Sequence, residues 1–326
     1  MEQKDISKDI VHIFPDSLRS RIGNIISRPD ITEIRIRCNL PLMIQTLSGE
    51  FYVTKEGELS LKEGNTCVVS PDEIKIIFQK ISQYSLFAYR EEIKEGFITL
   101  RGGHRMGLCG KVYFDSDGKR QVKQITSMNL RIARQIYGCA EKIFPYLFSH
   151  NEFLHTLLIS PPGVGKTTFL REIIRLISDG THGFSGQNIS VVDERSEIGN
   201  RTDTEYGFYL GKRTDLLDHC SKAHGMLMML RTMNPRVIAV DEIGAKKDIR
   251  ALQYIRNCGC RILMTAHGQN LQDILSRPVL GKYLKQFPFE RYVVFSVGVS
   301  GERIAEIYDR NQQLIWKGET MERRFL

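Results

Sequence analysis

One glycine-bearing segment near the middle of the chain restricts the fold more than any other feature. It consists of Ser160, Pro161, Pro162, Gly163, Val164, Gly165, Lys166, Thr167 and Thr168. The apolar run 157–159 precedes it, and residues 169–177 after it carry apolar side chains at helical spacing. A strand, a tight turn and a helix in this order surround an anion with backbone N–H groups and with the positive end of the helix dipole. The segment therefore predicts an α/β fold with a phosphate-binding loop.

The last residues of this segment predict a nucleoside triphosphate and Mg²⁺ as ligands. The ammonium group of Lys166 can reach the outer phosphates, and the hydroxyl group of Thr167 can bind Mg²⁺. The usual pattern begins with glycine, and this chain has Ser160 at that position. Gly163 and Gly165 remain where the backbone must approach the phosphates closely, so we expect the serine to matter little.

The composition is that of an ordinary globular protein, and the chain is long enough for two domains. Its 326 residues are 41% hydrophobic and 26% charged. The net charge of +8 includes no dense basic block, so we interpret it as a contribution to solubility. No apolar run reaches the roughly 18 residues of a membrane span. The charged N-terminus lacks an apolar signal region, and the seven cysteines are scattered without zinc-site spacing. Both features predict a cytoplasmic protein with reduced thiols.

Residues 1–125 are expected to form a small α+β domain. Strand patterns with turn residues between them occur at 31–37, 41–45, 50–54, 96–101 and 105–114. Ser70, followed by Pro71 and two acidic residues, is typical of a helix N-terminus. Gly102 and Gly103 lie between the last two strand patterns, which are therefore predicted to form a hairpin.

The rest of the chain is expected to hold a linker and an α/β domain. Residues 126–150, rich in Ile, Arg and Ala, are predicted as a helical linker, and residues 151–326 as the domain that contains the phosphate loop. Short apolar strands are expected at 157–159, 189–192, 237–240 and 262–265, with helices between them. This alternation predicts a mostly parallel sheet with helices on both faces. Three later segments, 291–297, 303–308 and 313–316, are expected to add antiparallel strands.

Polar residues follow three of these strands, at the edge where ligands bind in open α/β sheets. One strand is followed by Asp241, which can support Mg²⁺, and by Glu242, which can orient the attacking water. Another is followed by Asp193 and Glu194, either of which could polarise water. A third ends at His267, a candidate sensor of the γ-phosphate. The choice of general base among the two glutamates and Asp193 stays open.

The transition state of a nucleotide hydrolase also needs a cation besides the loop lysine. The candidates for such an arginine finger are Arg105, Arg195 and Arg213, with Arg101, Arg201 and Arg231 as further ones. An arginine that reaches the site of a neighbouring subunit requires a ring of subunits. No single arginine stands out in the sequence.

Several short segments in both predicted domains resemble one bacterial family. The segments of the α/β domain are 198–200, 213–218, 222–226, 231–235 and 240–244, and those of the first domain are 34–37, 85–89, 95–99 and 102–105. In this order they resemble the stage III sporulation protein AA family of endospore-forming bacteria. That family is similar to the ATPases that drive type II and type IV secretion systems and pilus motors.

The resemblance implies a RecA-like ATPase core behind a smaller α+β domain of the PAS-like secretion-ATPase type, usually assembled as a homohexamer. It also implies ATP and Mg²⁺ as ligands of the loop Ser160 to Thr168. By the same resemblance, residues 193–195 match the family's acidic box, Asp241 and Glu242 its metal and catalytic box, and His267 its histidine box. Many secretion ATPases have Gly-Glu at the second box, so Glu242 is the better match for the catalytic acid.

The role implied by the resemblance is an ATP-hydrolysing motor in the mother cell during endospore formation. Such a motor would energise a channel to the forespore, recruited to the membrane surface by an inner-membrane protein of the channel complex. Two other functions stay open. One is an ATPase stimulated by single-stranded nucleic acid, although nucleic acid is not expected because no appended binding module or aromatic-rich basic stretch is present. The other is a scaffold whose assembly is switched by ATP.

Overall fold

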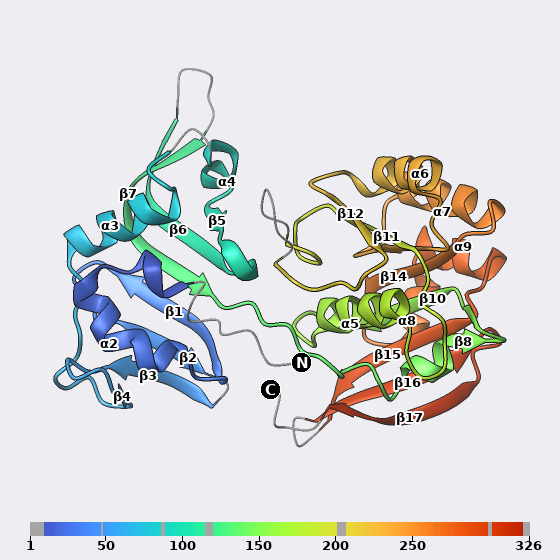
Figure 1. Ribbon diagram of the computed structural model, residues 1–326, viewed down its shortest axis with the longest axis horizontal. Coiled ribbons are helices and arrows are strands. Elements are labelled where there is room, and N and C mark those ends of the chain that lie inside the picture. Colours follow the sequence, from blue (N-terminus) through green and yellow to red (C-terminus); the bar gives the residue numbers. More distant parts are fainter. Residues whose placement is uncertain are drawn as a thin grey trace. The chain divides into compact units, whose positions relative to one another are not determined.

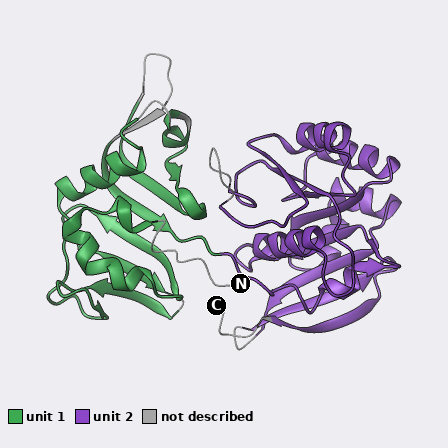
Figure 2. Cartoon of the chain, in the orientation of Figure 1, with its two compact units in different colours: residues 1–134 green, residues 135–326 purple. Residues whose placement is uncertain are grey.

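The computed structural model describes residues 10–46, 48–85, 89–114, 120–200, 207–298 and 302–321. The chain divides into two compact units, residues 1–134 and residues 135–326 (Figure 2). Arg201 and part of the segment 85–89, both used in the sequence argument, lie outside the described residues. Within the described residues, no helix is long and apolar enough to cross a membrane.

Unit 1 is built on an antiparallel seven-stranded sheet with the order β4-β3-β2-β1-β7-β6-β5 (Figure 1). Its strands are β1 (Ile31–Arg37), β2 (Met43–Thr46), β3 (Gly49–Val53), β4 (Leu59–Ser60), β5 (Phe97–Thr99), β6 (Arg105–Phe114) and β7 (Arg120–Arg131). Its helices are α2 (Asp16–Ile26), α3 (Pro71–Ile81) and α4 (Arg90–Lys94), with 3-10 turns at Val11–Ile13 and Arg101–Gly103. The apolar faces of α2 and α3 pack on the sheet and form the core of this unit.

The predicted helix start and hairpin of unit 1 are confirmed. The side chain of Ser70 accepts a hydrogen bond from the amide of Glu73, and the Glu73 carboxylate accepts one from the amide of Ser70, which makes a capping box. Strands β5 and β6 pair antiparallel across the predicted turn. Gly102 and Gly103 have φ angles of 80° and 94°, which favour glycine.

The predicted helical linker over 126–150 is wrong. Its first residues belong to strand β7, and its only helical turn is the 3-10 segment Phe144–Leu147. The reason is visible in the packing: Met128 and Leu130 alternate at period two, are buried, and pair with the long strand β6. Tertiary pairing therefore outweighs the helix-favouring composition of this stretch.

Unit 2 contains an eight-stranded sheet with the order β12-β11-β13-β14-β10-β15-β16-β17. The strands are β10 (Thr156–Ser160), β11 (Ile189–Asp193), β12 (Thr214–Asp218), β13 (Val237–Val240), β14 (Arg261–His267), β15 (Arg291–Val297), β16 (Arg303–Asp309) and β17 (Leu314–Met321). The two short strands β8 (Phe148–Ser149) and β9 (Glu152–Phe153) form a separate hairpin. The predicted mostly parallel sheet is confirmed, since every neighbouring pair from β12 to β15 is parallel.

Two details of this sheet differ from the sequence prediction. Strand β15 was expected to be antiparallel, but it pairs parallel with β10, and only β16 and β17 are antiparallel additions. Strand β12 was not predicted, because three of its five residues are polar and it lies at the edge of the described sheet, with a strand neighbour on one side.

Helices cover both faces of the sheet of unit 2 (Figure 1). On one face, α5 (Lys166–Asp179) packs its apolar side chains against the sheet, with Phe169 stacked on Phe295. The other face carries α6 (Lys222–Met233), α7 (Lys246–Asn257), α8 (Leu271–Ser276) and α9 (Leu280–Gln286). The central strands are therefore buried between two hydrophobic layers. The residues that follow β10, β13 and β14 lie together at the carboxyl edge of this sheet.

Candidate nucleotide-binding site

The predicted phosphate loop connects β10 to α5. Ser160 is the last residue of β10 and is fully buried, and its carbonyl accepts a hydrogen bond from the amide of Gly268 at 3.0 Å. Gly163 and Gly165 have φ angles of 80° and 96°, and Gly165 caps the N-terminus of α5. The first turn of α5 contains no acidic residue. The helix therefore presents its positive end and its free N–H groups to an anion.

The loop lysine lies beside the predicted histidine. Lys166 is buried, and its Nζ lies 3.1 Å from Nδ1 of His267. Burial lowers the pKa of Lys166, while Asp241 and Glu242 nearby act in the opposite direction. The pairing of Ser160 with His267 between β10 and β14 brings the histidine to the loop. Two residues that are far apart in the sequence therefore meet at this edge of the sheet.

Thr167 and Asp241 also meet at this edge. The hydroxyl of Thr167 donates a hydrogen bond of 3.1 Å to Oδ2 of Asp241. The other oxygen of Asp241 accepts a hydrogen bond from the hydroxyl of Thr265, a buried residue of β14. The same Thr265 hydroxyl accepts a hydrogen bond of 2.8 Å from the amide of Glu242. Sequence reasoning assigned Thr265 no role, because a threonine inside an apolar strand is an ordinary β-sheet residue.

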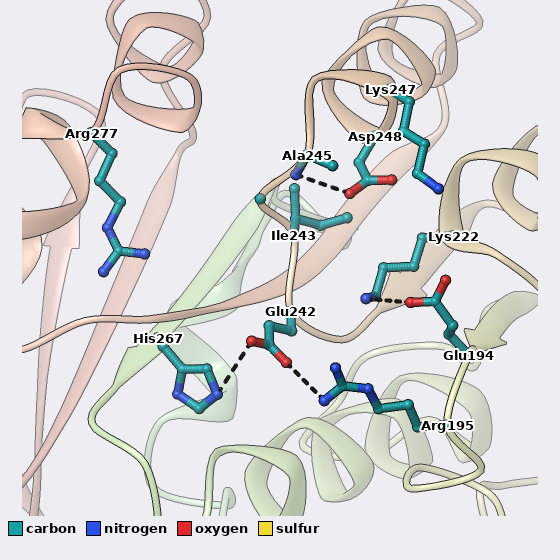
Figure 3. Close-up of a pocket in the computed structure, with 11 residues that line it drawn as sticks. Glu194, Arg195, Lys222, Glu242, Ile243, Ala245, Lys247, Asp248, His267 and Arg277 are labelled. Carbon is teal, nitrogen blue, oxygen red and sulfur yellow. Dashed lines mark hydrogen bonds and ion pairs between the residues drawn. The ribbon is translucent and has the colours of Figure 1, made fainter. Parts of the chain in front are cut away.

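Glu242 lies between two cationic or protonatable side chains and lines a pocket of about 300 Å³ (Figure 3). One of its oxygens is 3.7 Å from Nε2 of His267, and the other is 3.5 Å from the guanidinium of Arg195. The backbone of Glu242 has a φ angle of 49°, which is uncommon for a residue with a side chain. Such a conformation persists where the surroundings enforce it, here through Thr265.

Glu194, the second candidate base, lines the same pocket, but its carboxylate contacts Lys222 and not the residues around Glu242. Its carboxylate forms an ion pair of 2.7 Å with Lys222, at the start of α6 (Figure 3). The hydrogen bond from Lys222 lowers the pKa of Glu194. A carboxylate that is stabilised in its charged form is a weaker base, and the ion pair of Glu194 is closer than the 3.5 Å contact of Glu242 with Arg195.

Asp193, the third candidate base, is outside the pocket lining. It is 2% exposed, and its carboxylate accepts hydrogen bonds from the amides of Glu197, Ile198 and Gly199 at 2.8 to 2.9 Å. Burial raises the pKa of Asp193, and these backbone hydrogen bonds act against that effect. The carboxylate therefore holds the loop after β11 in place, and its catalytic role stays a prediction.

Arg171, which the sequence argument did not single out, holds the same loop from the other side. It is buried in α5, and its guanidinium donates to the carbonyls of Ile198 and Glu197, each at 2.9 Å. The guanidinium also lies 3.7 Å over the ring of Phe208. Burial lowers the pKa of Arg171 to about 10. The loop that carries Arg195 is thus attached to the helix of the phosphate loop.

The predicted arginine fingers have different surroundings. Arg195 lines the pocket and contacts Glu242. Arg213 donates to the carbonyl of Ser178, in the last turn of α5, at the end of the helix opposite to the phosphate loop. Arg105 belongs to unit 1, where its guanidinium lies 3.6 Å over the ring of Phe97. Among these three residues, Arg195 is the one that lines this pocket together with Glu242 and His267.

The oxygen atoms at the loop fit Mg²⁺ as it is usually bound with a nucleotide. In the described part of the chain, no group of three or more His, Cys, Asp or Glu side chains could hold a metal by itself. Mg²⁺ does not require such a group, because it keeps water ligands and takes phosphate oxygens with one or two protein oxygens. Thr167 and Asp241, with their oxygens 3.1 Å apart, are such a pair.

Comparison with solved structures defines the class of fold. The chain is similar to the ATPase DotB of Yersinia pseudotuberculosis, with a TM-score of 0.58, 15% sequence identity and coverage of 86% of this chain and 76% of that chain. It is also similar to the pilus retraction motor PilT with bound ADP, with a TM-score of 0.55, 15% identity and coverage of 92% and 82%. The fold is therefore that of the RecA-like secretion ATPases, as predicted.

Sequence comparison then gives the family. Residues 4–315 match the family model described as sporulation stage III, protein AA, to which this chain belongs. The chain is 35% identical over 309 residues to stage III sporulation protein AA of Bacillus subtilis (strain 168), which covers 94% of this chain and 96% of that protein. The family resemblance seen in the sequence is thus confirmed.

Proposed function

We propose that this chain hydrolyses ATP and works as a motor of the secretion-ATPase type during endospore formation. The observation that carries the proposal is the position of Glu242. Its carboxylate, in the residue after the Asp241 that pairs with Thr167, lies between His267 and Arg195 in the lining of a pocket. A carboxylate held in this way can accept a proton from a water that attacks the terminal phosphate.

Each residue of the site has a task in this proposal. The amides of the loop and the ammonium group of Lys166 bind the β- and γ-phosphates. Thr167 and Asp241 hold Mg²⁺, which when bound neutralises charge on the phosphate oxygens. His267 and Arg195 keep Glu242 oriented, and His267 is placed to respond to the terminal phosphate because it contacts both Lys166 and Glu242.

Motor function is the second part of the proposal. Family membership supports a role in sporulation, and the likeness to secretion ATPases shows the same fold. We propose that six copies form a ring, which is recruited to the mother-cell side of the membrane by an inner-membrane partner. ATP turnover in this ring would then energise a channel to the forespore.

Substitution of the loop lysine tests both parts. Lys166→Ala removes the ammonium group that binds the phosphates, and Lys282→Ala removes an exposed lysine of α9 as a matched control. We expect the first variant to lose MgATP turnover and to fail to restore sporulation in an endospore former that lacks its own family member. The control should behave as the wild type in both assays. Normal sporulation with Lys166→Ala would refute the motor, whatever the turnover.

Light scattering tests the ring. The wild type with MgATP should have about six times the mass of one chain if the proposal is right. A monomer under these conditions, with turnover intact, would refute the ring and leave hydrolysis in place.

A further inference from the structure

The strand β16 carries an arginine toward the phosphate loop. Residues of one strand alternate between the two faces of a sheet, so Arg303, Ala305 and Ile307 share a face. Ala305 and Ile307 are fully buried in the hydrophobic layer under α5, beside Phe169. Arg303 is the next residue on this face and the first of the strand. It therefore lies at the edge of the sheet where α5 begins.

The guanidinium of Arg303 lies against the turn before α5. A methyl group added at Gly165 would be 2.5 Å from one guanidinium nitrogen of Arg303. Burial lowers the pKa of Arg303, so the guanidinium is partly withdrawn from water. The positive φ angle of Gly165 favours glycine, and the short distance shows that the Arg303 guanidinium lies directly against this turn.

Two partly or fully buried cations thus surround the positive end of one helix. Lys166 is the first residue of α5, Arg303 lies beside Gly165, and no acidic residue is present in the first turn. Arg303 also interacts with other groups of the chain, but positive charge at a helix N-terminus is unfavourable. An anion that contacts both cations would offset this effect.

The order of strands in the sheet indicates in which direction the phosphate chain of a bound nucleotide extends. Glu242 and His267 follow β13 and β14, on one side of β10, and they mark the place of the terminal phosphate in the proposed function. Arg303 begins β16, on the other side of β10. A nucleotide that has its γ-phosphate at Glu242 and crosses the first turn of α5 therefore extends its α-phosphate toward Arg303.

We infer that Arg303 binds the α-phosphate of the nucleotide and is a positioning residue for ATP and ADP alike. This inference rests on the proposed function and names a ligand contact that the loop motif does not contain. Because the α-phosphate is present before and after hydrolysis, the contact contributes to affinity in both states. The arginine should therefore act on the binding of nucleotide and not on the chemical step.

The test compares Arg303→Ala with Arg310→Ala, which removes an exposed arginine at the end of the same strand. We expect the first variant to raise the KM for ATP and the Kd for ADP about tenfold, as for one charge-assisted hydrogen bond. Its kcat at saturating ATP should stay within about twofold of the wild type. The control should change neither constant. An unchanged KM and Kd, or a loss confined to kcat, would overturn the inference.

Sulfur substitution at the α-phosphate separates a direct contact from a structural role. The Rp and Sp diastereomers of ATPαS place sulfur at different α-oxygens, and a guanidinium that donates to one of them distinguishes the two. We expect the ratio of their KM values to change several-fold in Arg303→Ala. Packing defects would raise both KM values together, so an unchanged ratio would contradict the inference.

If the Arg303→Ala variant does not fold, Arg303→Lys is used for the same measurements. Lysine keeps the charge and most of the packing but loses the planar fork of the guanidinium. A raised KM for ATP with a changed ATPαS ratio would support the inference, and wild-type values of both would overturn it. If the wild type itself neither binds nor hydrolyses ATP, the proposed function fails, which is a result distinct from any of these.

Discussion

The hydroxyl of Thr265 donates a hydrogen bond to the carboxylate of Asp241 and accepts one from the amide of the next residue, Glu242. One side chain of β14 thereby fixes both acidic residues that follow β13. The carboxylate of Asp241 accepts a hydrogen bond from Thr167. The backbone of Glu242 has a positive φ angle, and its carboxylate lies beside His267. The turn between the proposed metal ligand and the candidate base is thus set by a residue of the neighbouring strand.

Removal of this hydroxyl should impair turnover and leave nucleotide binding in place. Thr265→Val keeps the shape of the side chain but leaves the amide of Glu242 without its partner, at a cost of about 1–3 kcal/mol. We expect kcat to fall about tenfold or more while the KM for ATP stays within about twofold. Thr265→Ser keeps the hydroxyl and should restore most of the activity. Equal losses in the valine and serine variants would show that the hydroxyl is not the cause.

Asp193→Asn should act on the stability of the loop after β11. The amide group cannot accept at both positions, so at least one of the backbone amides of residues 197–199 loses its partner. We expect the free energy of unfolding to fall by about 1–3 kcal/mol, measured by urea denaturation. Glu194→Gln, which breaks a partly exposed ion pair, is the control and should cost less than about 1 kcal/mol. A stable Asp193→Asn variant without turnover would instead indicate a catalytic Asp193.

His155 should make unit 2 sensitive to mild acid. This histidine is buried, and its Nδ1 accepts a hydrogen bond from the amide of Ile262, which requires an unprotonated nitrogen. Burial lowers the pKa of His155 from 6.5 to about 4. Because the folded-state pKa is the lower one, the unfolded chain takes up the proton first as the pH falls. The contribution of His155 to stability is therefore complete above about pH 6.5 and is lost between that pH and about pH 4.

The matching measurement is the free energy of unfolding of the full chain as a function of pH. Between pH 7 and pH 5 the wild type should lose about 2 kcal/mol more than His155→Gln, in which the amide oxygen can still accept from Ile262. His224→Gln removes an exposed histidine of α6 and should follow the wild type. Parallel curves for the wild type and His155→Gln would refute the assignment.

Much of this fold could be predicted from local sequence patterns. Continuous apolar runs such as 237–240 predicted the central parallel strands, and Ser70 followed by Pro71 and two acidic residues predicted a helix start. Strand β12 and the end of β7 could not be predicted, because their formation depends on neighbours distant in the sequence. Local composition has no information about such a partner.

The candidate site also contains residues that local sequence patterns indicate and residues that depend on neighbouring strands. The loop, Asp241, Glu242 and His267 were found because each comes directly before or after a strand or helix that the sequence indicates. Thr265 and Arg303 were not candidates in the sequence, since their positions beside Asp241 and Gly165 come from the pairing of strands and not from their own segments. A buried threonine or a lone arginine in a strand has no pattern that marks it.

The most direct test of the central claim is ATP turnover by Glu242→Gln at saturating MgATP. Glutamine keeps the shape of the side chain but does not accept a proton from water, so turnover should fall by about 100-fold or more while ATP still binds. Glu141→Gln removes an exposed carboxylate of the same unit and should leave turnover unchanged. Turnover of Glu242→Gln within a few-fold of the wild type would contradict the assignment of Glu242 as the base.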